Sequence, residues 1–570
     1  MASIENDSTF VAPEGVYSLT EEYKPPPIHA TTAGIAASFH SRLTTITVKF
    51  TPPKAGSQGL TSLLGGGKAV KEKKKEEEGL GSGESEHEPE PELEPDLDEP
   101  STPQQQQQLF SPTGLKTGPL TPRKKSVARP KNSIKTTSSS FVTRLHTMEG
   151  LTKYLAGKIG DVTFMFYNAG KSFYWMDVSA KNKVKEPLAR ISFSQFPTCH
   201  AVNPLTSSST CLDIVIGFNT GDLIWFEPLS SRYVRINKQV VHNPNQPMNL
   251  SPCTQVRWVP SSRTLLLASY ADGTIVVYDI ERQDAPFVPH DPSKPMLLPP
   301  VQDSDEQQSS SAASERMWDP LNEILVTSHS GPDGKNLKNP VSHWRLTQKK
   351  SVVDFVFSPD VRYVAAISED GYLRIIDALS ETLMDVYQAY FGALTCLAWS
   401  PDGRYILTGG QDDLVTVLSP WEQRIVARCQ GHLSFVSSVA FDASRIDSRT
   451  YRFGSVGEDN RLIFWDLSSG ALHRPKLHPS HALSSTLSLG LRRSHGNLVA
   501  GGVHQSETDR FHPAPSRMEV ATIQPVVVKP IDGEHLLAHV SFLPSGVMTM
   551  TRAGHIKQWV RPLEVKTRKQ

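Results

Sequence analysis

The sequence predicts an all-β protein, a seven-bladed β-propeller with a long disordered insertion in its first blade and two long loops. The first observation behind this prediction is a recurring phrase. "CLAWSPDGRYILTGGQDDLVTVLS", from Cys396 to Ser419, alternates apolar segments with two polar turns. Seven related units occur along the chain, and they begin at Phe164, Ile214, Val256, Phe355, Cys396, Val439 and Val540. A repeat of tens of residues is typical of propellers and solenoids.

The second observation is the spacing of the turn that precedes the third strand of each unit. This turn falls at Gly170, Gly221, Gly273, Gly371, Asp413, Asn460 and Gly554. The intervals are 51, 52, 98, 42, 47 and 94 residues, whereas one four-stranded propeller blade takes about 40–45 residues. The two long intervals therefore need insertions.

Each unit has the composition of three short strands. Apolar segments rich in Val, Ile, Phe, Tyr and Thr are separated by Pro, Asp and Gly turns, and a weaker fourth strand such as Arg424–Gln430 usually follows. A single blade cannot bury its faces, but a closed ring of blades can. We expect Thr44–Phe50 to form the first strand of blade 1 and Gly15–Tyr23 to complete blade 7, so that the two ends of the chain close the ring.

This assignment divides the chain into six parts. Residues 1–50 supply strands for closure and blade 1, 51–140 form a disordered low-complexity insertion, 141–467 hold blades 1 to 6 with a loop at about 289–316, 468–525 form a long flexible loop, 526–562 form the last blade, and 563–570 are a C-terminal tail. The insertion contains "KEKKKEEE" and "ESEHEPEPELEPDLDEP". Such a composition buries too little apolar area to offset the entropy of ordering.

One unit carries a distinctive set of polar residues, namely His432, Ser455, Asp459 and Trp465. The set resembles the signature of WD40 repeats, in which these residue types form a buried hydrogen-bonded chain. Such groups are tolerated in a core only when each is paired. We therefore expect a structural tetrad in blade 6. Other units replace the tryptophan and are expected to depend more on packing, with Tyr278, Ile376 and Leu418 in its place.

Composition excludes several classes of function. Lysine plus arginine and aspartate plus glutamate both number 59, so no net charge draws the chain to nucleic acid or to an anionic membrane. The five cysteines contain no CxxC pair, which disfavours a disulfide framework or a zinc site. No apolar run approaches the roughly 18 residues that span a bilayer, and the N-terminus does not resemble a secretory signal. We expect a protein of the cytoplasm, and also of the nucleus if the basic cluster Arg123–Lys131 is an import signal.

No pattern in the sequence indicates catalysis. GxSxG, Walker and HExxH motifs are absent, and the recurring turn aspartates are explained by turn formation. We expect no enzyme activity, no cofactor, no metal site and no small-molecule substrate. Ser111-Pro112 and Thr121-Pro122 are candidate proline-directed phosphorylation sites, although such short motifs arise often by chance.

A rigid disc with loops is suited to binding other proteins. Tyr390 and Phe391 stand just before the first strand of blade 5, and Phe435 stands at the same place in blade 6. Aromatic residues dominate interface hot spots, so these three are the candidate partner-binding residues. The alternative is that one of them folds into the core. Trp421 is a weaker candidate, which we expect to pack on the outer strand of blade 5.

Several longer phrases resemble one family in particular. "PEGVYSLTEEY", "GFNTGDLIWFEP", "YFGALTCLAWSPDGRYILTGG" and "YRFGSVGEDNRLIFWDL" are similar to the fungal catabolite-repression WD40 proteins of the CreC type and, more distantly, to an animal WD-repeat relative. The likeness covers nearly everything outside Thr51–Arg129 and the two later loops. It implies a non-catalytic partner that binds and stabilises or activates a ubiquitin-specific protease of the CreB type, and thereby influences carbon catabolite repression. It also implies that Phe391 and Phe435 face the protease.

Two alternative functions remain open. A substrate receptor of a cullin ligase usually carries arginine two places after the blade-ending Trp-Asp, but in this chain Trp465-Asp466 is followed by Leu467-Ser468. A chromatin- or RNA-associated WD40 adaptor would depend on the basic cluster Arg123–Lys131, which is more simply a solvated charge run.

Overall fold

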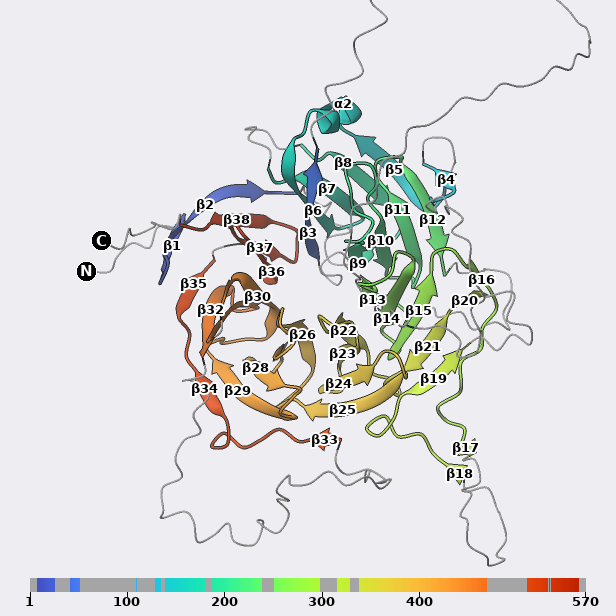
Figure 1. Ribbon diagram of the computed structural model, residues 1–570, viewed down its shortest axis with the longest axis vertical. Helices are drawn as coiled ribbons and strands as arrows, with labels where there is room; N and C mark the ends of the chain where they lie inside the picture. The colour runs from blue at the N-terminus through green and yellow to red at the C-terminus, as the bar shows by residue number, and fades with distance from the viewer. Residues whose placement is uncertain are drawn as a thin grey trace, which may run out of the picture.

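The computed structural model describes residues 8–25, 41–51, 109, 129–134, 139–179, 186–237, 251–297, 315–328, 338–447, 449–468, 510–531, 533 and 535–562. Within them, seven sheets of four or five strands stand around a common centre (Figure 1). The prediction of an all-β, seven-bladed propeller is confirmed.

Blades 1 to 3 each contain five strands, whose order runs from the centre outwards. Blade 1 has β3 (Leu43–Phe50), β6 (Gly160–Ala169), β7 (Ser172–Asp177), β8 (Ala189–Phe193) and β5 (Val142–Thr147). Blade 2 has β9 (Pro197–Val202), β10 (Ile214–Phe218), β11 (Leu223–Glu227), β12 (Arg232–Ile236) and β4 (Asn132–Ser133). Blade 3 has β13 (Cys253–Trp258), β14 (Leu265–Tyr270), β15 (Thr274–Asp279), β21 (Ser342–Arg345) and β19 (Leu325–Ser328).

Blades 4 to 7 follow the same plan. Blade 4 has β22 (Val352–Phe357), β23 (Tyr363–Ser368), β24 (Tyr372–Asp377), β25 (Thr382–Gln388) and β33 (Phe511–His512). Blade 5 has β26 (Leu394–Trp399), β27 (Ile406–Gly410), β28 (Leu414–Ser419), β29 (Arg424–Gln430) and β34 (Ala521–Ile523). Blade 6 has β30 (Val436–Ile446), β31 (Thr450–Gly457), β32 (Arg461–Ser468) and β35 (Val527–Pro530). Blade 7 has β36 (Leu537–Leu543), β37 (Gly546–Thr551), β38 (Ile556–Val560), β2 (Gly15–Tyr23) and β1 (Thr9–Ala12).

The remaining elements lie outside the blades. The short helix α2 (Leu151–Ala156) precedes β6. Two small ladders join β16 (Gln283–Asp284) to β20 (Lys338–Asn339), and β17 (Met296–Leu297) to β18 (Glu315–Arg316).

The blades are held together by apolar contact between neighbouring sheets. The middle strands have buried residues on both faces, as β10 and β11 show along their whole length, and this explains their continuous apolar sequences. One cluster joins Trp225 of blade 2 to Val256 and Leu266 of blade 3, and another joins Leu407 of blade 5 to Val436 of blade 6. Burial of this kind is the main source of stability in the ring.

Hydroxyl groups also connect neighbouring blades at the centre. Thr198 of β9 donates a hydrogen bond to the carbonyl of Cys253 at 2.6 Å, and Thr254 of β13 donates to the carbonyl of Val352 at the same distance. Ser437 of β30 donates to the carbonyl of Leu537 at 2.8 Å. The inner strands of blades 3 and 6 have bulges at Thr254 and Ser437. Each bulged residue is left out of its ladder, so its side chain can reach the next blade.

The two ends of the chain meet in the last blade. β2 runs antiparallel to β38, with Ser18 opposite Val560, and the inner strand β3 of blade 1 contacts β36 (Figure 1). The guanidinium of Arg452 in blade 6 lies 3.1 Å from both carboxylate oxygens of Glu14, in the turn between β1 and β2. Closure therefore combines main-chain pairing with a buried ion pair.

The structure differs from the sequence-based expectation in three segments assigned to disorder or loops. Within 51–140, residues 132–133 form β4 on the outer edge of blade 2. Within 289–316, β17 pairs with β18. Within 468–525, β33 and β34 add parallel edge strands to blades 4 and 5. These ladders contain two or three residues, too few for a periodic signal. β4, β33 and β34 cover blade edges that would otherwise be unpaired, whereas β17 and β18 form a separate sheet.

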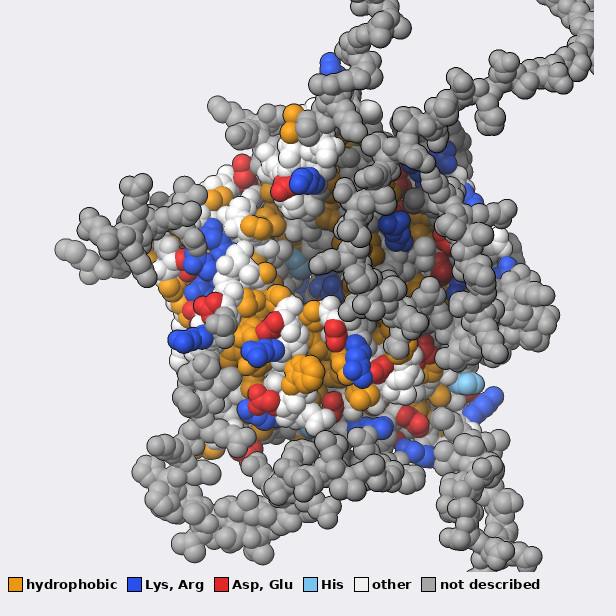
Figure 2. All heavy atoms as spheres, in the orientation of Figure 1, with side chains coloured by type: hydrophobic (Ala, Val, Ile, Leu, Met, Phe, Trp, Pro, Cys, Tyr) orange, Lys and Arg blue, Asp and Glu red, His pale blue; other side chains and the backbone are white. Residues whose placement is uncertain are grey.

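Several expectations fall outside the described residues. The candidate phosphorylation sites Ser111 and Thr121, the tail 563–570 and most of the basic cluster 123–131 belong to this part of the chain. Over blades 4 and 5, the visible face carries hydrophobic side chains with acidic and basic side chains between them (Figure 2). Positive and negative side chains are therefore mixed there, and do not form large patches of one sign.

Candidate protein-interaction site

The candidate partner-binding residues lie in two neighbouring loops at one end of blades 5 and 6. Phe391, between β25 and β26, is 75% exposed, and Phe435, between β29 and β30, is 40% exposed. Leu433 beside Phe435 is also exposed. Tyr390 is half-buried, and its hydroxyl has no hydrogen-bond partner among the described residues. Phe391 and Phe435 therefore do not belong to the core, whereas Tyr390 is partly buried and partly exposed.

Contacts with the β27–β28 turn hold the Phe391 loop. The backbone N–H of Ala393 donates to Gln411 Oε1 at 3.1 Å, and the N–H of Gln411 donates to the Ala393 carbonyl at 3.0 Å. Gly392 has a φ of 66°, and a Cβ there would lie 3.0 Å from the Gln411 side chain. Only glycine fits this position without strain. Phe391 is thus presented by a loop with a defined shape.

The tetrad residues support the Phe435 loop. Nδ1 of His432 lies 3.0 Å from Asp459 Oδ1, and Nε2 of His432 lies 2.7 Å from Ser455 Oγ. Trp465 Nε1 donates to the same Ser455 Oγ at 2.8 Å. Asp459 also accepts the backbone N–H of Leu433 at 2.9 Å. The four side chains form one hydrogen-bonded chain from the strand core to the exposed loop.

The charge of Asp459 is stabilised in this arrangement. Burial raises the pKa of its carboxyl group, but hydrogen bonds from His432 and from two backbone N–H groups outweigh burial and bring the pKa below its ordinary value. The next turn residue contributes as well, since the N–H of Glu458 donates to the Phe435 carbonyl at 2.9 Å. The loop is therefore fixed on both sides of Phe435.

A groove of about 510 Å³ lies beside Phe391. Its lining includes Tyr390, the turn carboxylates Asp412 and Asp413, and the guanidinium groups of Arg428 and Arg517. Burial raises the pKa of Asp412 to about 6. The groove can accept a polar side chain next to the aromatic surface, an arrangement typical of a hot spot with a polar rim.

Blades 3 and 4 have other polar contacts where blade 6 has the tetrad, in addition to their packing. In blade 4 the fully buried Arg374 donates to Asp370 Oδ2 and to Ser368 Oγ, both at 2.8 Å. In blade 3 the hydroxyls of Tyr270 and Tyr278 are 3.0 Å apart in the core. A buried polar side chain needs a hydrogen-bond partner, and arginine or tyrosine can provide one where tryptophan is absent.

Trp421 differs from its expected place. It is 79% exposed in the turn between β28 and β29, and does not pack on the outer strand of blade 5. β28 begins at the Asp412 turn and ends at this turn, so Trp421 lies at the opposite end of the blade from Phe391. Sequence alone could not show this, since apolar character does not reveal what covers a turn residue.

The described residues contain no cluster of three or more His, Cys, Asp or Glu side chains that could hold a metal ion. All five cysteines are free thiols. In the described part of the chain, no helix has the length and apolar character needed to cross a membrane.

Comparison with known proteins identifies the family. Residues 382–417 match the WD domain, G-beta repeat, a segment from β25 to β28. The chain is 35% identical over 444 residues to the UBP9-binding protein bun62 of Schizosaccharomyces pombe, and the alignment covers 75% of each chain. The chain belongs to this family of WD40-repeat proteins. The resemblance to WD40 proteins is confirmed, and both the family and the fold are those of a non-catalytic scaffold.

Proposed function

We propose that this chain is a non-catalytic scaffold that binds a ubiquitin-specific protease through the surface formed by Tyr390, Phe391, Leu433 and Phe435. The observation that carries the proposal is the similarity, over three quarters of the chain, to a relative described as binding UBP9. The exposed aromatic pair and the adjoining groove support this choice of surface.

The rigidity of the site suggests how binding would change the protease. Both loops are fixed by hydrogen bonds before any partner arrives, so little ordering entropy is lost on binding. If the rigid surface binds the active conformation of the protease more tightly than its other conformations, binding increases the population of the active conformation. The scaffold then activates or stabilises the enzyme without taking part in the chemistry.

The test is a binding and activity measurement with the double substitution Phe391→Ala and Phe435→Ala. Burial of the exposed parts of two Phe side chains, about 200 Å² in total, at about 25 cal/mol per Å² corresponds to about 5 kcal/mol. Because area converts poorly into affinity, we expect a loss of about 100-fold or more in Kd. Isothermal titration with the purified protease measures the affinity, and a ubiquitin-cleavage assay measures stimulation.

Trp421→Ala is the matched control, because it removes an even more exposed aromatic group at the opposite end of blade 5. It should leave the affinity unchanged. Loss of a hot-spot residue costs at least ~2 kcal/mol of binding free energy. If the affinity of the double variant stays within about threefold of wild type, the interface lies elsewhere.

The biological setting is part of the same proposal. We place the complex in the cytoplasm, or also in the nucleus, and assign it to the regulation of carbon catabolite repression by removal of ubiquitin. The sequence resemblance to WD40 proteins of the CreC type supports this assignment. Loss of repression in a strain with the double substitution, together with imaging of a fluorescent fusion, tests it.

A further inference from the structure

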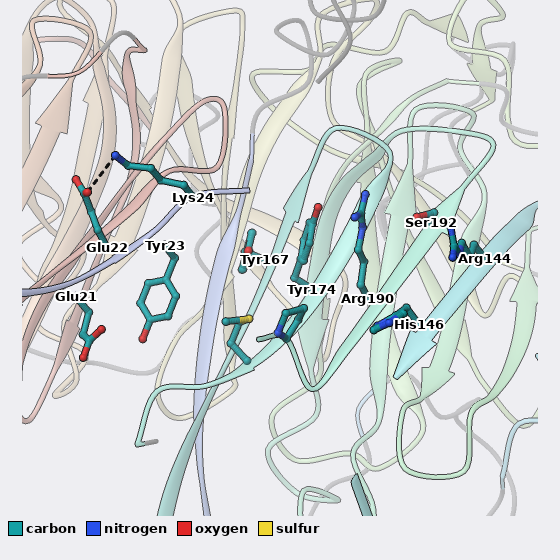
Figure 3. Close-up of a pocket in the computed structure, with 12 residues that line it drawn as sticks. Glu21, Glu22, Tyr23, Lys24, Arg144, His146, Tyr167, Tyr174, Arg190 and Ser192 are labelled. Carbon is teal, nitrogen blue, oxygen red and sulfur yellow. Dashed lines mark ion pairs between the residues drawn. The ribbon is translucent and has the colours of Figure 1, made fainter. Parts of the chain in front are cut away.

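A second groove lies at the seam where the ring closes, away from the Phe391 surface. It has a volume of about 630 Å³ and runs between β2 of blade 7 and the outer strands of blade 1. One wall carries Tyr174, Arg190, Arg144 and His146, and the other carries Glu22, Tyr23 and Lys24 (Figure 3). We call it the seam groove.

The strand register places the residues of the blade 1 wall in one row. Tyr167 lies opposite Tyr174, Tyr174 opposite Arg190, and Arg190 opposite His146. Residues directly opposite one another point to the same face of a sheet. The inner end of the row is the stacked pair Tyr167 and Tyr174, with ring centroids 4.7 Å apart, and it belongs to the core between blades 7 and 1. The outer end is open, because His146 is exposed.

Two arginines, Arg144 and Arg190, lie on neighbouring strands of the blade 1 wall. Arg144 lies opposite Ser192, two residues from Arg190 along β8, so the two arginines are diagonal neighbours with Cα atoms about 7–8 Å apart. The Arg190 guanidinium lies over the Tyr174 ring at 5.4 Å and makes two long contacts of 3.4 Å with Ser172 Oγ. Among the described residues, no carboxylate pairs with Arg144 or Arg190.

One carboxylate of the opposite wall is already paired on its own side. Glu22 is within 3.2 Å of Lys24 Nζ and 3.8 Å of Lys557 Nζ, so its charge is compensated on blade 7. Glu21 also lines this wall. The blade 1 wall thus carries two guanidinium groups that pair with no carboxylate of the described residues, and such groups can donate charge-assisted hydrogen bonds to a carboxylate.

We propose that the seam groove is a second docking site, which takes an extended acidic segment of a partner protein. A carboxylate of that segment accepts hydrogen bonds from Arg144 and Arg190, which line the groove together. Charge complementarity selects the occupant, because arginine pairs carboxylates in a bidentate manner. The site does not depend on the proposed protease interface, which lies on blades 5 and 6.

The experiment uses the full chain and a fluorescein-labelled peptide of three Asp-Leu-Glu repeats. Fluorescence anisotropy measures its Kd, and the same peptide with Asn and Gln in place of Asp and Glu is the peptide control. We expect Arg144→Glu to weaken binding about tenfold or more, and Arg144→Lys to weaken it less. Arg144 is exposed, so this variant should fold normally. Arg449→Glu, an exposed arginine in the β30–β31 turn of blade 6, is the matched control and should bind like wild type.

The outcomes decide between occupants. Equal binding of the acidic and neutral peptides, or a Kd for Arg144→Glu within about twofold of wild type, overturns the proposal. Binding that appears only after deletion of residues 84–99, the acidic tract of this same chain, would make that tract the occupant and would also overturn docking of a partner. Binding by the intact chain that weakens from 0.1 to 1 M salt, as the Debye length falls from about 10 Å to about 3 Å, supports it.

Discussion

Replacement of Asp459 by alanine should destabilise the propeller, because this carboxylate connects the tetrad to the Phe435 loop. It accepts hydrogen bonds from His432 at 3.0 Å, from the Leu433 N–H at 2.9 Å and from the Arg461 N–H at 3.2 Å. The His432 side chain is fully buried, so its N–H loses its partner where water cannot replace it. That loss costs about 1–3 kcal/mol. Leu433 is exposed and its N–H can bind water, which adds about 0.5 kcal/mol.

The expected change in the free energy of unfolding is therefore about 1.5–3.5 kcal/mol. Urea unfolding followed by tryptophan fluorescence measures it. Asp447→Ala is the matched control, because Asp447 also caps backbone N–H groups, those of Arg449 and Thr450 at 2.7 Å, but is exposed and contacts no buried side chain. A change for Asp459→Ala no larger than that of the control, within about 0.5 kcal/mol, would refute the claim that the buried histidine needs this carboxylate.

Three further predictions concern other parts of the ring. Gly392→Ala should weaken protease binding but lower stability by only about 1–2 kcal/mol, because a Cβ at a φ of 66° collides with Gln411; calorimetric titration and thermal melts separate the two effects. Glu14→Gln should cost about 1–2 kcal/mol, because Arg452 loses one of two carboxylate partners and keeps Asp466, and urea unfolding against wild type checks this. Burial lowers the pKa of His200 to about 3. The unfolded chain therefore takes up a proton near the ordinary pKa of histidine that the folded chain does not, and this group alone lowers stability by up to about 1.4 kcal/mol per pH unit below about 6.5. Because burial also lowers the pKa of His343 and His539, His200→Gln should reduce the slope by this one contribution in urea unfolding at pH 7.5 and 5.5.

Much of the fold was predictable because each blade repeats the same local signals. The apolar segments are long enough to be seen, and turn residues such as Gly273 and Asn460 have the positive φ that the turn requires. The short edge strands were not predictable. β33 and β34 contain two and three residues, and their pairing with β25 and β29 depends on the distance between blades in space.

The candidate sites, too, were predictable only in part. The residue types around Phe391 and Phe435 could be chosen from the sequence, because both stand before a first strand and are aromatic. Their exposure could not, since it depends on which neighbouring side chains cover them. The row from Tyr174 to His146 left no signal at all, because its members come from separate strands that the register alone brings together.

The pairing of β2 with β38 has a consequence for biosynthesis. Tyr23 leaves the ribosome about 540 residues before Val560, so at about 5–20 residues per second β2 waits roughly 30–110 s for the strand that it completes. During that time its main-chain groups are available to chaperones or to a neighbouring nascent chain. A premature stop codon at position 556 would remove β38, the strand that joins β1 and β2 to the rest of blade 7, so a truncation at this point is expected to mark the product for degradation.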